Sequence, residues 1–86
     1  MNSSPQPPAE SLQLTLEPAD TRLLANVCGP LNENLRHLEQ RLHVIIHARG
    51  NEFDISGDAS HIFAARQTLI ALHADAQSGR SITAEL

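Results

Sequence analysis

The chain has no lysine, tryptophan or tyrosine, and one cysteine among its 86 residues. The absence of lysine excludes a Walker A phosphate-binding loop within this sequence, because that loop requires a lysine. A single cysteine, Cys28, cannot form an internal disulfide, which is typical of a reducing compartment. Apolar runs such as residues 44–46 are far too short to cross a membrane. We therefore expect a cytoplasmic protein with no membrane partner.

Aromatic residues and positive charge are also scarce. Phe53 and Phe63 are the two phenylalanines, so the core must be built from aliphatic side chains. The formal net charge is −4, and all six basic residues are arginines. This balance argues against a nucleic-acid binder that depends on a basic patch. Arginine is nevertheless well suited to bidentate phosphate contacts and to stacking on bases.

Composition divides the chain into three parts. Residues 1–11 hold three of the five prolines and three serines, and are predicted to form a disordered N-terminal tail. Residues 12–77 are predicted to form one domain. Residues 78–86 are interpreted as a linker toward a further domain that this sequence does not contain. A core this small is marginally stable, so a partner domain or a homo-oligomer is expected.

The first third of the chain predicts a strand followed by a helix. Residues 12–17 alternate apolar and polar side chains, the pattern of a strand with one buried face. Asp20 can cap a helix over about residues 20–28. Gly29 followed by Pro30 supplies the signal that ends this helix.

A second helix is predicted to begin within about four residues of the first. Asn32 can cap a helix over about residues 33–42, in which leucines recur at helical spacing. A corner this tight favours a positive φ angle at Gly29. It is also a place where free backbone N–H groups can meet a phosphate.

The second half of the chain predicts a hairpin and a long helix. Residues 43–49 and 52–56 alternate with a period of two and are joined by a tight turn at Gly50. Asp58 can cap a final helix that extends to about residue 76. The predicted inward side chains of this helix are Ile62, Ala65, Leu69 and Leu72.

These elements give the order β-α-α-β-β-α. Three amphipathic strands and three helices predict an α+β fold: a two-layer sandwich in which a three-stranded antiparallel sheet packs on three helices. This order, with a turn led by Gly29 between the first two helices, resembles the type I KH domain. The resemblance implies a GxxG loop that clamps about four unpaired nucleotides. Here Asn32 replaces the second glycine, and Pro30 removes one N–H donor from the loop.

Four separated segments carry a more specific resemblance. Residues 14–18, 24–35, 38–42 and 48–51 together are similar to the N-terminal domain of bacterial PhoH-family ATPases. The resemblance implies that a KH-like domain precedes a P-loop ATPase, where ATP and magnesium would bind. It also implies links to RNA metabolism, ribosome maturation and an endoribonuclease partner. No cofactor and no catalytic residue are expected in the present segment.

The predicted RNA contacts lie at the corner, at the hairpin turn and along the exposed edge of the strand over residues 44–49, where the edge and Arg49 would read or stack on bases. Arg36 has an alternative, because Glu33 or Glu39 at helical spacing can form surface ion pairs with it. Asn51 is also explained as a turn residue, and the corner itself can be purely structural. The predicted nucleic-acid-binding residues are Gly29, Pro30, Leu31, Asn32, Asn34, Arg36, Arg49 and Asn51.

Other chemistry has little support in the sequence. His43 and His47 share one face of a strand but are too far apart to hold one zinc ion. Cys28 is interpreted as a small core residue. Two functions remain open: weak binding of single-stranded RNA, presented to the protein's own ATPase domain, or a protein–protein or oligomerisation module that has the KH topology without nucleic-acid contacts.

Overall fold

The computed structural model describes residues 10–82. The predicted order of helices and strands is confirmed. Residues 1–9 of the predicted tail and residues 83–86 of the predicted linker lie outside the described residues. The elements are β1 (Glu10–Thr15), α1 (Thr21–Cys28), a 3-10 turn η1 (Pro30–Asn32), α2 (Glu33–Leu42), β2 (Ile45–Arg49), β3 (Glu52–Gly57) and α3 (Ala59–Gln77).

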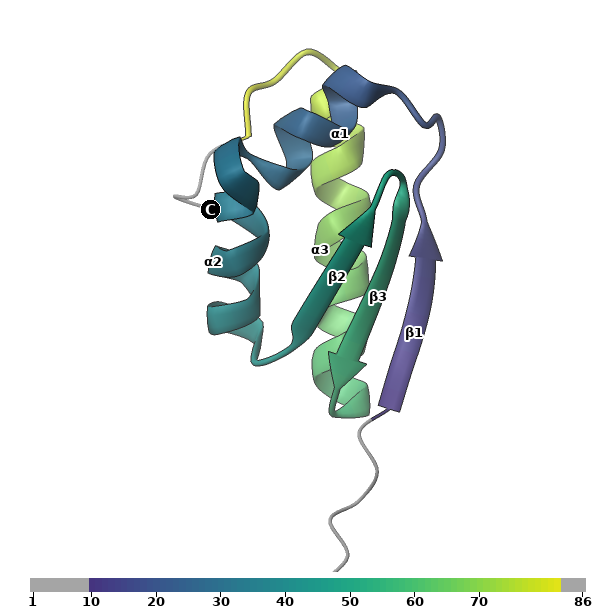
Figure 1. Ribbon diagram of the computed structural model, residues 1–86, viewed down its shortest axis with the longest axis vertical. Helices are drawn as coiled ribbons and strands as arrows, with labels where there is room; N and C mark the ends of the chain where they lie inside the picture. The colour runs from purple at the N-terminus through teal and green to yellow at the C-terminus, as the bar shows by residue number, and fades with distance from the viewer. Residues whose placement is uncertain (1–9, 83–86) are drawn as a thin grey trace, which may run out of the picture.

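The three strands form one antiparallel sheet in the order β1-β3-β2. The helices lie on one side of this sheet: α3 runs behind the strands, α2 stands beside β2, and α1 crosses one end (Figure 1). The predicted α+β class and three-stranded antiparallel sheet are therefore confirmed. Within residues 10–82, no helix is both long enough and apolar enough to cross a membrane.

The core lies between the sheet and the helices and is almost entirely aliphatic. Phe53 and Ile55 of β3 are fully buried at its centre, because β3 is the middle strand. The alternation that predicted these two side chains to face inward is confirmed. The four predicted inward residues of α3 are also buried, namely Ile62, Ala65, Leu69 and Leu72.

Strand β1 begins earlier than predicted. Glu10 and Ser11, which we assigned to the disordered tail, pair with Gly57 and Ser56 of β3. That part of the tail prediction is wrong. Side-chain hydrophobicity marks the strand only from Leu12, whereas backbone pairing continues as far as β3 offers partners.

The helix caps agree only partly with prediction. Asp20 caps α1: its Oδ1 accepts hydrogen bonds from the backbone N–H groups of Arg22 and Leu23 at 2.8 and 3.2 Å. Asp58 occupies the N-cap position of α3, but its side chain makes no capping hydrogen bond there.

The two phenylalanines make a matched pair for testing the core. Phe53 is fully buried, whereas Phe63 on α3 is 61% exposed. We expect Phe53→Ala to lower the free energy of unfolding by about 3–5 kcal/mol, and Phe63→Ala to lower it by less than about 0.5 kcal/mol. Urea denaturation at low protein concentration measures both. Equal losses for the two variants would contradict the position assigned to β3.

Candidate nucleic-acid interface

A sharp corner joins α1 to α2. Gly29 has φ 78° and ψ 169°, a backbone region open essentially to glycine alone. Leu31 and Asn32 follow with φ angles of 54° and 59°. The predicted positive φ at Gly29 is confirmed. Asn32 holds the N-cap position of α2, but it is left-handed and its side chain does not cap the helix, so the predicted cap is wrong.

A groove of about 320 Å³ lies beside this corner. Residues of the corner and of the β2–β3 turn both line this groove, and Gly50 in the turn has a φ angle of 58°. The structure therefore brings together the two segments that the sequence marked as candidate contacts. The lining residues are Thr21, Leu24, Ala25, Cys28, Gly29, Asn32 and Gly50.

The contribution of α1 to this groove was missed in the sequence. Thr21, Leu24, Ala25 and Cys28 recur at helical spacing, so they form a stripe along one side of α1. Leu24 and Cys28, which we interpreted as a small core residue, are both half-buried and pack against the core while they line the groove. The spacing was a usable signal, but it does not distinguish a core stripe from a groove wall.

Asn34 departs from its predicted role. It is fully buried, and its Nδ2 donates toward the carbonyl oxygens of Asn26, Val27 and Ile82 at 3.3, 3.2 and 3.3 Å. The side chain therefore closes the end of α1 from inside and is not accessible to RNA. Its Oδ1 is buried and has no hydrogen-bond partner among the described residues.

Asn51 is also occupied by an internal role. Its Nδ2 donates to the carbonyl oxygen of Leu16 at 3.0 Å, and the N–H of Leu16 donates to the carbonyl oxygen of Asn51 at 2.9 Å. This exchange ties the chain beyond β1 to the hairpin turn. The turn interpretation of Asn51 is thereby favoured over a nucleic-acid contact.

The two predicted arginines remain at the surface. Arg49 ends β2 directly before Gly50, so it lies next to the groove, and Arg36 is exposed on α2. We suggested an ion pair between Arg36 and Glu39, but in the structure the Glu39 carboxylate has another partner. Glu39 Oε2 instead accepts the backbone N–H of Ile46 at 2.7 Å.

The Glu39 carboxylate occupies part of the outer edge of β2. The predicted contact with bases used the edge of residues 44–49, and Glu39 already occupies the Ile46 position on it. The register pairs Ala48 with Phe53, and Ala48 has the same outward direction as Ile46 two residues earlier. The part of the edge left for a ligand is therefore the part nearest the groove.

The groove is lined by uncharged side chains. Cys28 contributes its thiol, and burial raises the pKa of that thiol, so it stays protonated at neutral pH. Cys28 also packs against the core, in agreement with its interpretation as a small core residue. Among residues 10–82, no three histidine, cysteine, aspartate or glutamate side chains gather into a metal-binding group.

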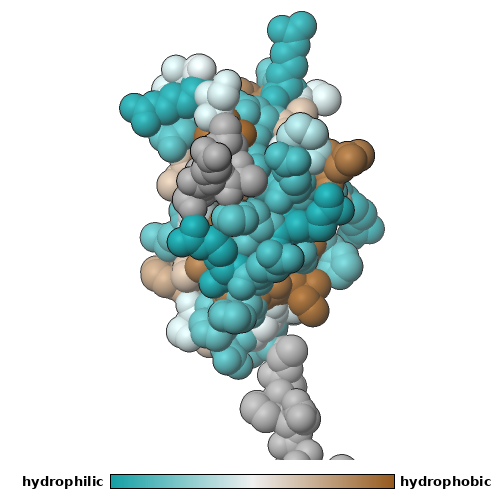
Figure 2. Space-filling model, turned by 90° about the vertical axis from the view of Figure 1, so that its left-hand side faces the viewer, coloured by the Kyte–Doolittle hydropathy of each residue, from teal (hydrophilic) through white to brown (hydrophobic). Residues whose placement is uncertain are grey.

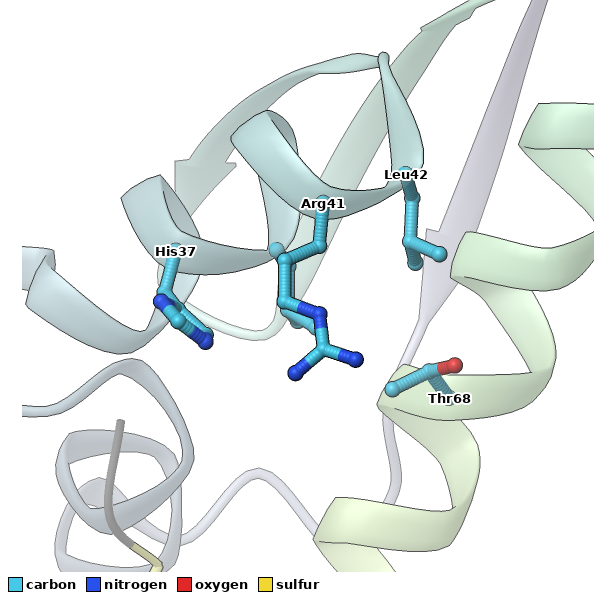
Figure 3. Close-up of a pocket in the computed structure, with 5 residues that line it drawn as sticks. His37, Arg41, Leu42 and Thr68 are labelled. Atoms are coloured by element: carbon cyan, nitrogen blue, oxygen red, sulfur yellow. The ribbon is translucent and has the colours of Figure 1, made fainter. Parts of the chain in front are cut away.

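A second, smaller hollow of about 150 Å³ lies between α2 and α3. Figure 3 shows His37 and Arg41 projecting from α2 into the space that Thr68 of α3 faces. The Nε2 atom of His37 is buried there without a hydrogen-bond partner among the described residues. The surface over the α2 side is mainly hydrophilic, with apolar side chains confined to small patches (Figure 2).

Comparison with known proteins gives one consistent match. PhoH-like proteins of Mycobacterium tuberculosis (strain H37Rv), Mycobacterium bovis and Mycobacterium leprae are each 34% identical to the chain over 64 residues. The chain is thus similar in sequence to PhoH-like proteins over most of its own length. The match covers 74% of this chain but 18% of each relative, so the chain spans less than a fifth of their length. The predicted resemblance is thus confirmed, although no family model matches the chain.

Two glycines allow the corner to be tested. A Cβ atom at Gly29 would lie 2.8 Å from the Cγ of Asn34, whereas a Cβ at Gly50 would meet open space. We expect Gly29→Ala to lower the free energy of unfolding by about 1–3 kcal/mol, and Gly50→Ala by about 1 kcal/mol. Thermal unfolding compares the two variants. A smaller loss at Gly29 than at Gly50 would contradict the described packing of Asn34.

The Cys28 thiol provides a chemical test of the groove. Because burial raises its pKa, less thiolate is present and alkylation by iodoacetamide near pH 8 should be slower than in the urea-unfolded chain. The difference should shrink as the pH rises toward the folded-state pKa. Mass spectrometry follows the reaction without interference, because the sequence has no second cysteine. Equal rates in the folded and unfolded chains would contradict the described burial.

Proposed function

We propose that residues 10–82 form a KH-like domain that binds single-stranded RNA weakly through the groove. One observation carries this proposal: the Gly29 corner and the Gly50 turn line a single groove although they are 21 positions apart. Exposed Arg49 stands at its margin. The element order and the sequence similarity to PhoH-like proteins support the same proposal.

The side chains that line the groove suggest how an RNA strand would lie in it. Thr21 and Asn32 offer uncharged hydrogen-bonding groups to sugar and phosphate, and Arg49 offers a guanidinium group for phosphate contact or stacking. Leu24 and Cys28 offer an apolar wall for the faces of bases. Counterion release dominates the affinity of most nucleic-acid binders, so a groove lined by uncharged side chains binds weakly.

The resemblance extends the proposal to the longer protein. In it, this domain would present RNA to an attached cytoplasmic P-loop ATPase that binds ATP and magnesium. An endoribonuclease partner belongs to the same proposal. The domain itself would supply binding and no catalysis.

A protein-binding function has its own supporting observation. Leu31, at the tip of the corner, is 86% exposed and has a left-handed backbone. A leucine displayed in this way, next to an uncharged groove, suits the side chain of a protein partner as well as it suits a base. This is the second candidate function.

Titration of the isotope-labelled chain with short unpaired RNA at low salt separates the two functions. RNA binding should shift the backbone amides of Thr21, Gly29, Leu31, Asn32 and residues 48–50, and the shifts should fade as salt rises. Arg49→Glu should weaken binding about tenfold, as expected for loss of one charge-assisted contact. Arg41→Glu, near the end of α2, is the matched control and should change affinity little, because Arg41 is exposed like Arg49 and does not line the groove.

The absence of shifts at high RNA concentration would overturn the RNA proposal and leave the protein-binding function. Shifts spread over α3, with equal effects of the two arginine variants, would also overturn it. In that case binding would follow overall charge and not the groove.

A further inference from the structure

The outer edge of β1 is unpaired within the described residues. The sheet order β1-β3-β2 gives β1 a partner on one side only. The backbone N–H of Leu16, directly after β1, donates to the carbonyl oxygen of Asn51, and the C=O of Leu16 accepts from the Asn51 side chain. Even-numbered residues in this segment therefore direct their backbone groups toward β3. Backbone groups alternate in direction along a strand. Ser11, Gln13 and Thr15 therefore direct their N–H and C=O groups outward.

This edge lacks the usual protection against pairing. Native edge strands are commonly blocked by charged side chains, proline or a bulge. Residues 11–15 contain no charge and no proline, and they pair with β3 without a bulge. At the opposite edge of the sheet, the Glu39 carboxylate accepts a hydrogen bond from the N–H of Ile46 on β2 and so covers it. One edge is thus protected and the other is open.

An apolar flank of α3 lies on the same side as this open edge. Phe63 and Ile70 are 61% and 37% exposed and are two turns apart on the helix. Thr68 faces α2 across the smaller hollow, which places α2 on the other side of α3. The Nε2 of His73 lies 3.3 Å from the carbonyl oxygen of Pro18, just beyond β1. Helical geometry then places Phe63 and Ile70 toward β1.

We infer that this face binds a second copy of the same chain. The two β1 strands would pair antiparallel about a two-fold axis at Gln13, which continues the sheet from one copy into the other. Ser11 of each copy would then lie opposite Thr15 of the other. These pairs would form about six backbone hydrogen bonds, two for each hydrogen-bonded pair. The two α3 flanks, Phe63 with Ile70, would pack together beneath.

Self-complementarity favours a second copy over an unrelated partner. With Gln13 on the axis, Leu12 of one copy lies opposite Leu14 of the other on the helix-covered side of the sheet, so apolar side chains meet. Glu10 is placed opposite Leu16, so no like charges face each other along the strand. On the flank, the guanidinium group of Arg66 donates to Gln67 Oε1 at 3.1 Å.

The inference does not depend on RNA binding, but it has a consequence for it. None of the residues that line the groove beside Gly29 and Gly50 belongs to β1 or α3, so pairing through β1 and α3 uses other residues. Two weak grooves held in one assembly can bind one strand more tightly than either alone. Association would also cover the apolar flank of a domain too small to bury much surface.

Sedimentation equilibrium of the 86-residue chain from about 10 µM to about 1 mM tests the inference, because mass action then reveals even a weak dimer. Gln13→Pro should abolish the dimer while preserving the fold, because the N–H of Gln13 points away from β3 and proline is tolerated at such edge positions. The double variant Phe63→Ser with Ile70→Ser should also abolish it. Ile45→Ser, which alters an apolar residue of similar exposure on β2, is the matched control and should have no effect.

Hydrogen exchange supplies a test without mutation. In the dimer, the amides of Ser11, Gln13 and Thr15 should gain protection as concentration rises, while those of Leu12 and Leu14 are protected throughout. A monomer over the whole concentration range would overturn the inference. A dimer that survives Gln13→Pro, or that Ile45→Ser dissociates, would also overturn it, because another surface would then mediate association.

Discussion

The buried amide of Asn34 is the interaction on which the corner depends. Its Nδ2 lies within 3.3 Å of three carbonyl oxygens, two at the end of α1 and one at Ile82 after α3. The polar ends of helices need such partners when they are removed from water. The position of this amide also requires glycine at residue 29, because a side chain there would collide with the amide.

The groove is a consequence of this arrangement. With α1 fixed against α2 by Asn34, the outer stripe of α1 faces the β2–β3 turn, and the Gly29 corner closes one end. Asn26 holds the chain after α3 by exchanging hydrogen bonds with Arg80 and Ile82 at 2.7 and 2.9 Å. The segment that follows α3 therefore lies beside the corner, as Figure 1 shows for its path over α1.

Apolar periodicity predicted nearly all of the secondary structure, whereas polar side chains were assigned less well. Alternation placed Phe53 and Ile55 correctly, because a strand with one buried face leaves no other arrangement for them. Asn34 was predicted to contact nucleic acid, but its side chain is buried. An asparagine at a helix start satisfies many hydrogen-bonding patterns, and its actual partners, such as Ile82, are distant in the chain. Sequence spacing contains no information on such partners.

The sequence by itself determined the element order, the inward side chains and the positive φ at Gly29, since these follow from local periodicity and backbone sterics. Tertiary structure decided that the corner and the Gly50 turn share a groove, and that Glu39 covers one edge of the sheet. It also decided that β1 stays open beside Phe63. These features depend on strand order and helix placement, which set contacts between residues that are far apart in the sequence.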